Sequence, residues 1–363
     1  MWDKKLKYGT KMFPRSIDMQ NKIVAVEKLL PEAIELFKVR YALLQTIMQK
    51  GPIGRRSLTT HLALSERMIR GEVDKLAQNG LVAVTVQGII ITKPGEEVLN
   101  TLYLPLHYLE ALTRQEEELK EKLGLKRAII LKGNLEQDEE TKTSLGFAVS
   151  SLLEEMLTAH TTIAITGGTT IANMVHYMPK SQQHYEDLHV LPARGSVGQR
   201  VELHANTIAV ELANKLGGMY EILTIPDNLS HQSISLIKNE PQIEKLLQKL
   251  AKTDMIIFGI GNALKMAKHR KEPQEVLNLL EQKTAVAEAF RHYFNAEGQV
   301  VYASEVIGVA PDMAKKIPIR IAVAGGKSKA EAIVATRSLL QKGYLIVDED
   351  AATAILNHLA VKG

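Results

Sequence analysis

Residues 162–175 read TIAITGGTTIANMV, and this stretch decides which class of fold the larger part of the chain adopts. A mostly apolar run ends at Gly167 and Gly168, Thr169 and Thr170 follow, and apolar residues then recur at helical spacing. Strand, glycine turn and helix in this order are typical of a parallel α/β sheet. The start of the helix, with its free N–H groups and two hydroxyls, indicates an anion site. A purely structural tight turn is the alternative.

Six further apolar runs of strand length lie on either side of this stretch. They occupy residues 127–131, 189–193, 220–225, 254–260, 319–325 and 344–348, and helical patterns separate most of them. Strands that alternate with helices predict a doubly wound, mostly parallel sheet with helices on both faces. We assign this α/β domain to residues 125–363. We expect its ligand at the carboxyl ends of the strands, near a topological switch point.

Three more strand ends carry side chains suited to a small phosphorylated ligand. Arg194 follows one strand and offers a forked donor to a phosphate or a sugar hydroxyl, and His204 lies near the start of the next helix. The segment KMAKHRKEP supplies several cations, most of them a solvated face, of which one can bind phosphate. A second double-glycine turn, AVAGGKSKAEAI, places Lys329 at its mouth. Glu288 would repel phosphates, so we expect it to face sugar hydroxyls; an exposed helical glutamate is the alternative.

Residues 31–93 show a different pattern from the rest of the chain. Apolar residues recur at helical spacing over 31–49, KGPIG breaks that helix, and two shorter helices and two short strands follow. Three helices followed by a hairpin are typical of a winged helix-turn-helix, a DNA-binding fold.

Several arginines of this segment are placed to contact DNA. The apolar stripe of the last helix turns Arg67 and Arg70 to the opposite face, where base edges or phosphates lie in a complex. Arg55 and Arg56, at the start of the preceding helix, are placed to reach backbone phosphates, and Ser65 is a good N-cap for the last helix. A winged helix used for protein contacts is the alternative.

Charge is divided unevenly along the 363 residues. Residues 1–95 contain 16 Lys and Arg against 8 Asp and Glu, a balance of +8, whereas residues 96–363 contain 29 against 33, a balance of −4. A basic small domain beside a mildly acidic larger one favours double-stranded DNA as partner of the first. We interpret residues 1–30 as a flexible basic arm.

Two absences in the sequence narrow the class of protein. There is no cysteine, which suits a reducing cytosol and excludes disulfides and thiolate metal sites. No apolar run approaches the roughly 18 residues of a membrane helix. We therefore expect a cytoplasmic protein without a membrane partner.

Residues 94–124 carry leucines in a heptad-like rhythm, with Pro105 at a point where a kink or break is expected. We predict a linker and dimerisation helix, because proteins that read DNA are usually dimers, and we expect a homodimer or homotetramer. A helix that packs on its own domain is the alternative.

Taken together, these motifs resemble the SorC/DeoR-type bacterial regulators. The similarity extends from about Pro31 onward and rests on GPIGRRSLTTHLALSERMIRGEVDKLAQNGLV, TGGTTIANM, PARG, ANTIA, AEAFRHYFN and VAGGKSKAEAI. It implies a repressor without enzymatic activity, whose effector domain is similar to ribose-5-phosphate isomerase and glucosamine-6-phosphate deaminase. In the nearest members the effector is fructose 1,6-bisphosphate, which weakens operator binding at a glycolytic operon. No other cofactor and no metal is implied.

The resemblance also implies roles for individual residues. The effector site would consist of Gly167, Gly168, Thr169, Thr170, Arg194, His204, Arg270, Glu288 and Lys329. His204 stands where relatives often have glutamine, which alters one polar contact to the sugar. The rival hypothesis is a sugar-phosphate isomerase or deaminase with an accessory nucleic-acid-binding domain, in which Glu288 or His204 acts as the base.

Overall fold

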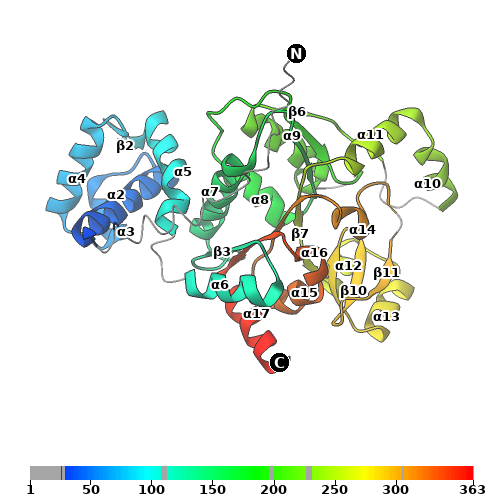
Figure 1. Ribbon diagram of the computed structural model, residues 1–363. Coiled ribbons are helices and arrows are strands. Elements are labelled where there is room, and N and C mark those ends of the chain that lie inside the picture. The colour runs from blue at the N-terminus through cyan, green and yellow to red at the C-terminus, as the bar shows by residue number, and fades with distance from the viewer. Residues whose placement is uncertain are drawn as a thin grey trace, which may run out of the picture. The chain divides into compact units, whose positions relative to one another are not determined.

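The computed structural model describes residue 26 and residues 29–107, 113–195, 200–225, 231–304 and 306–362 (Figure 1). The chain divides into two compact units, Met1–Ala111 and Leu112–Gly363. The arm predicted for residues 1–30 lies almost wholly outside the described residues. In the part of the chain that the structure describes, no helix is both long and apolar enough to cross a membrane.

The first unit contains the three helices and the hairpin that the sequence predicts. Its elements are α2 (Pro31–Lys50), α3 (Arg55–Leu62), α4 (Glu66–Gln78), β1 (Val82–Thr85), β2 (Gly88–Ile91) and α5 (Lys93–His107). Ser65 caps α4, since its hydroxyl accepts a hydrogen bond from the N–H of Met68 at 3.3 Å. Leu58, Ile69 and Val73 are fully buried and hold α3 against α4. The winged helix-turn-helix fold is thus confirmed.

Two helices occupy most of the segment for which the sequence predicts a single linker helix. α5 continues past Pro105 and ends at His107, and α6 (Thr113–Leu123) follows after residues that are not described. Leu119 and Leu123 of α6 are buried in the core of the second unit. Glu116, also buried, accepts a hydrogen bond from the N–H of Ile130 at 2.7 Å. α6 thus packs on its own domain, and a role in dimerisation stays a prediction.

Seven strands form the main sheet of the second unit. They are β3 (Arg127–Leu131), β4 (Thr162–Ile165), β5 (His189–Pro192), β6 (Met219–Tyr220), β7 (Met255–Gly259), β12 (Ile319–Val323) and β13 (Tyr344–Asp348). Their order is β3-β13-β12-β7-β4-β5-β6, and each neighbouring pair is parallel. The predicted α/β fold with a parallel sheet is therefore confirmed.

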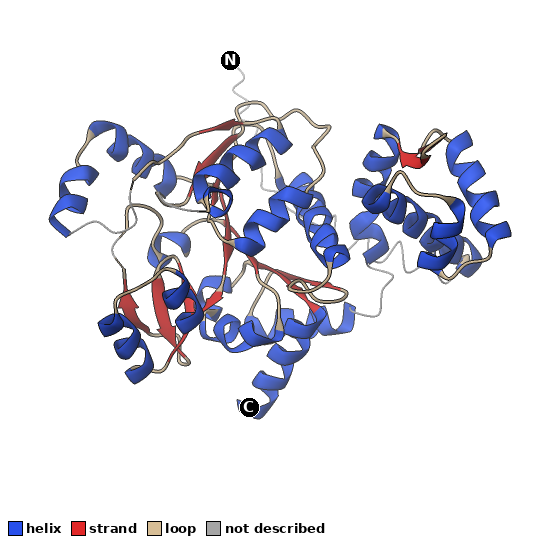
Figure 2. Cartoon of the chain, turned by 180° about the vertical axis from the view of Figure 1, so that it is seen from behind, coloured by secondary structure: helices blue, strands red, loops and turns tan. Residues whose placement is uncertain are grey.

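Helices cover both faces of this sheet, as the red strands between blue helices in Figure 2 show. One face carries α7 (Glu139–Met156), α8 (Thr169–Tyr177) and α9 (Ala205–Leu216). The other carries α6, α10 (His231–Lys238), α11 (Pro241–Ala251), α14 (Pro311–Ala314), α15 (Ala330–Ala335), α16 (Arg337–Leu340) and α17 (Glu349–Lys362). Because both faces are covered, a polar ligand can approach the strands only at their ends.

The chain changes direction across the sheet between β4 and β7. From β4 the chain continues to β5 and β6 on one side, and from β7 it continues to β12 and β13 on the other. Neighbouring strands whose connections run in opposite directions leave a crevice at their carboxyl ends. The Gly167–Gly168 turn follows β4, and Gly261 follows β7, so both lie at this switch point.

A four-stranded antiparallel sheet, which the sequence patterns do not predict, completes the second unit. Its strands are β8 (Gly261–Asn262), β9 (Ala285–Ala289), β10 (His292–Asn295) and β11 (Val300–Ala303), in the order β11-β10-β9-β8. The helices α12 (Ala263–His269) and α13 (Gln274–Gln282) pack against β9. Glu288 thus lies in a buried strand, and the alternative of an exposed helical glutamate is wrong.

The apolar run at residues 220–225 forms a much shorter strand than its composition predicts. β6 ends at Tyr220, because the side chain of Asn206 takes over the backbone groups of Leu223. The Asn206 amide donates to the carbonyl of Leu223 at 3.0 Å and accepts from its N–H at 2.8 Å. A side chain from α9 thus replaces a neighbouring strand at this point.

Candidate functional site

A close approach of two backbone segments shapes the first glycine turn. A Cβ atom on Gly167 would lie 2.4 Å from the carbonyl oxygen of Leu203, in the short helix η1 (Val201–Leu203). Gly168 has a φ of +120° and donates its N–H to the same carbonyl at 3.0 Å. The amide of Gly168 is therefore engaged within the protein. The turn instead brings the backbone of His204 beside it.

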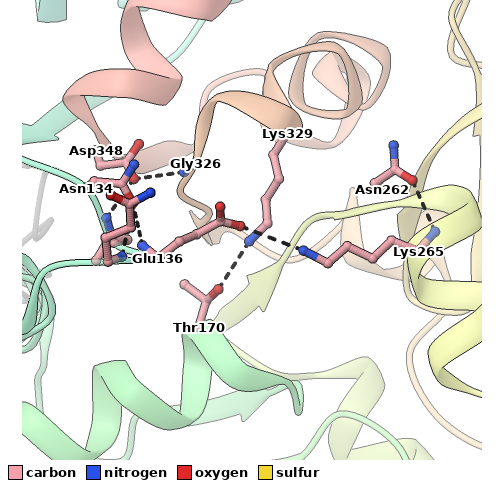
Figure 3. A network of polar contacts seen from close by, with 10 residues as sticks. Asn134, Glu136, Thr170, Asn262, Lys265, Gly326, Lys329 and Asp348 are labelled. Carbon is pink, nitrogen blue, oxygen red and sulfur yellow. Dashed lines mark hydrogen bonds and ion pairs between the residues drawn. The ribbon is translucent and has the colours of Figure 1, made fainter.

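Helix α8 begins directly after this turn and directs its N-terminus toward the switch point. No hydrogen bond from a described side chain caps it, so its first N–H groups and the helix dipole favour an anion. Thr169 is exposed and Thr170 is partly buried. The ammonium of Lys329, in the short helix η2 (Lys327–Lys329), donates to the hydroxyl of Thr170 at 3.3 Å (Figure 3). The structure thus brings a cation, a hydroxyl and a helix N-terminus together.

Asp348, at the end of β13, holds the second glycine turn in place. Its fully buried carboxylate accepts N–H groups from Leu135 at 2.8 Å, Gly326 at 2.8 Å and Ala351 at 2.9 Å. It therefore fixes the loop after β3 and the loop after β12 against each other (Figure 3). Asp348 is not among the predicted site residues, although an acidic residue at the end of the otherwise apolar YLIVD strand is a signal.

A second cluster centres on the ion pair between Arg270 and Glu288. Nη1 of Arg270 lies 2.9 Å from Oε1, and Nη2 donates to Oε2 at 3.1 Å. Oε1 also accepts the N–H of Arg291 at 2.7 Å. Burial by itself would raise the pKa of Glu288, but the charges of Arg270 and Arg194 hold that pKa below its ordinary value. Glu288 is therefore ionised, and both of its oxygens face arginine groups.

Three further residues of this cluster come from outside the predicted set. Arg291, only 3% exposed, pairs with Glu272 at 3.1 Å, and the Ser304 hydroxyl donates to the same carboxylate at 3.3 Å. Arg194 lies nearby, since its charge acts on Glu288, and its backbone pairs with Gly308. No spacing rule in the sequence links these residues, because each partner comes from a different loop or strand.

The segment after β7 connects the two clusters. Gly261 pairs with Glu288 across the small sheet, and Asn262 caps α12 by accepting from the N–H of Lys265 at 3.1 Å. Lys265 extends toward the other cluster, which contains Thr170 and Lys329. Its ammonium lies 3.9 Å from a carboxylate oxygen of Glu136 (Figure 3). Among the described residues, no group of three or more His, Asp or Glu side chains is placed to hold a metal ion.

In the first unit, the structure places the predicted DNA-binding arginines in two different situations. Arg56, Arg67 and Arg70 are exposed, and Arg70 lies 3.9 Å from Glu66 one turn earlier. Arg55 instead donates to Asp74 of α4 at 3.0 Å and is partly buried. Its guanidinium therefore helps to join α3 to α4.

Both units match known protein families. Residues 107–357 match a family of sugar-binding domains (Sugar-bind), and residues 36–104 match the CggR N-terminal DNA binding domain. The central glycolytic genes regulator of Bacillus subtilis is 39% identical over 338 residues, which cover 93% of this chain and 99% of that protein.

Solved structures show the same architecture. A protein from Enterococcus faecalis, described as a SorC family transcriptional regulator, is 35% identical with a TM-score of 0.63; the match covers 67% of this chain and 99% of that one. The full-length sorbitol operon regulator SorC from Klebsiella pneumoniae has a TM-score of 0.62 and covers 88% of this chain and 98% of its own. At 16% identity, the latter supports the fold alone.

Proposed function

The chain belongs to the SorC family of transcriptional regulators, and on this premise we propose that a phosphosugar, expected to be fructose 1,6-bisphosphate, binds at the β4–β7 switch point. Its relatives are regulators with a DNA-binding domain, and the chain is a sugar-modulated regulator, not an enzyme. In our proposal it is a cytoplasmic repressor of a glycolytic operon, and the bound effector weakens its hold on the operator.

The arrangement of cations around the switch point supports a ligand with two anionic groups. Lys329 and the N-terminus of α8 lie on one side. Arg270 and Arg194 lie beside the small sheet, which β8 joins to the end of β7. One phosphoryl group of a bisphosphate can neutralise Lys329 and the other the two arginines, and arginine pairs with phosphate through two parallel hydrogen bonds. In this proposal the phosphate draws Arg270 away from Glu288, which leaves that carboxylate for a sugar hydroxyl.

For the DNA-binding unit we propose that α4 enters the major groove. Arg67 and Arg70 would contact base edges or phosphates there, Ser65 would fix the start of the helix, and Arg56 would reach the backbone. Arg55 would act mainly by holding α3 on α4 through Asp74. A homodimer or homotetramer would present paired recognition helices to two half-sites.

Operator binding in the presence and absence of effector tests the proposed function. An operator duplex isolated by selection on the full chain is titrated at fixed salt, because phosphate contacts make DNA affinity salt-dependent. We expect fructose 1,6-bisphosphate to weaken binding by about 5- to 150-fold, the usual range of an allosteric coupling, and fructose to have no effect.

The variant Arg70→Ala separates the two units in this experiment. It should lose operator affinity while fructose 1,6-bisphosphate still binds, as measured by calorimetry. An operator affinity that no sugar phosphate changes would overturn the proposal.

As the pH rises, effector binding should weaken at a lower pH than it would if Lys329 had the pKa of an ordinary lysine. Burial lowers the pKa of Lys329, with the charge of Glu136 opposing the shift, and a bound phosphate would raise that pKa again. The complex then holds the proton more tightly than the free chain, so affinity falls as pH rises through the lowered pKa. Calorimetry in buffers of different ionisation enthalpy, above the phosphate pKa of about 6, should detect proton uptake on binding. Equal uptake in Lys329→Met would contradict this assignment.

A further inference from the structure

The carboxylate of Glu136 lies at the mouth of the proposed effector site. A Cβ atom built on Gly326 would lie 2.6 Å from Cδ of Glu136 and 2.8 Å from its Oε2, so the carboxylate rests against this glycine. Oε1 lies 3.9 Å from the ammonium of Lys265. Figure 3 shows the side chain directed toward Lys329, whose pKa its charge also affects. One carboxylate thus stands between two lysines.

Side-chain hydrogen bonds hold the loop after β3 in place, and they position Glu136 over the second glycine turn. The side chain of Asn134 accepts the N–H of Glu136 at 2.8 Å and donates to Asp350 at 2.6 Å. The N–H of Leu135 is bound by Asp348, which also binds Gly326. The backbone around Glu136 is therefore tied to the same anchor as the turn it covers.

Charge and position together indicate how this carboxylate acts on an incoming anion. Lys265 and Lys329 flank Glu136, and Lys329 also bonds Thr170 at the start of α8. A phosphoryl group that enters between them must displace Glu136 or stand against its negative charge, and like charges a few ångströms apart repel each other.

We propose that Glu136 occupies the position between Lys265 and Lys329 that the phosphoryl group of the effector takes, and that it competes with this group. This inference rests on the proposed function, because it concerns the same site. Glu136 thereby lowers the affinity for every anion and favours ligands whose second phosphoryl group binds at Arg270 and Arg194. Inorganic phosphate, which lacks that second contact, therefore binds only weakly to the full chain.

Binding measurements on three proteins test this inference. The full chain, Glu136→Gln and the matched control Glu140→Gln, an exposed glutamate at the start of α7, are titrated by calorimetry with fructose 1,6-bisphosphate and with inorganic phosphate. Melting temperatures confirm that all three are folded. We expect Glu136→Gln to bind both anions at least tenfold more tightly than the full chain, and Glu140→Gln to bind them as the full chain does.

The outcomes separate this inference from the proposed function. If Glu136→Gln binds fructose 1,6-bisphosphate with equal or lower affinity, Glu136 does not compete with the effector, and the inference is overturned. If no protein binds a sugar phosphate but Glu136→Gln binds inorganic phosphate more tightly than the full chain, the competition stands and the proposed function falls. If no variant binds either anion, both fall.

Discussion

Lys329→Met is expected to abolish the effector response and to lower the affinity for fructose 1,6-bisphosphate by at least about 100-fold. Its ammonium is partly buried, bonds Thr170 and lies at the start of α8. A charged hydrogen bond contributes about 1.5–3 kcal/mol, and its loss leaves the phosphoryl group without its counter-charge. Methionine keeps the length and the apolar stem of the side chain. Calorimetry measures the affinity directly.

The matched control for this variant is Lys327→Met, an exposed lysine in the same turn. It should change the affinity by no more than about threefold, since an exposed charge contributes little. Operator binding without effector should be normal in both variants. If Lys329→Met binds the effector as Lys327→Met does, the anion site lies elsewhere.

Asp348→Ala is expected to destabilise the second unit by about 3 kcal/mol or more. The substitution leaves three buried N–H groups without an acceptor, and each such group costs about 1–3 kcal/mol. Urea denaturation of the full chain, followed by circular dichroism, measures the loss. Asp350→Ala, which removes an exposed partner of Asn134, should cost less than about 1 kcal/mol. Equal effects would show that Asp348 does not anchor the two loops.

Local signals in the sequence predict the order of the helices and strands in the DNA-binding unit. α4 runs from Glu66 to Gln78, because Ser65, the N-cap expected from the sequence, caps it and a stripe of buried residues holds one face. Six of the seven main-sheet strands could also be predicted, since a strand buried on both faces is a continuous apolar run, whereas β6 is shorter than its apolar run. The small sheet could not be predicted, because its strands are short and contain polar residues such as His292 and Asn295.

The candidate site was only partly predictable. The sequence indicated which loops meet at the switch point, because parallel strands place their carboxyl ends at one edge. It did not reveal Asp348 or Glu136, whose partners come from other strands and loops and are up to 213 residues away in the chain. The predicted effector site also includes Gly167 and Gly168, whereas the N–H group of Gly168 donates to Leu203 and that of Gly326 donates to Asp348.

The pairing of β3 with β13 determines when a newly made chain can complete its sugar-binding domain. β3 is the first strand of the sheet, yet its neighbour ends only at Asp348. During translation the winged helix leaves the ribosome early and consists of local contacts, so it can fold first. The sugar-binding domain can complete its sheet only after β13 has been synthesised. An unfinished polypeptide can therefore hold a folded DNA-binding unit before its sugar-binding domain is complete.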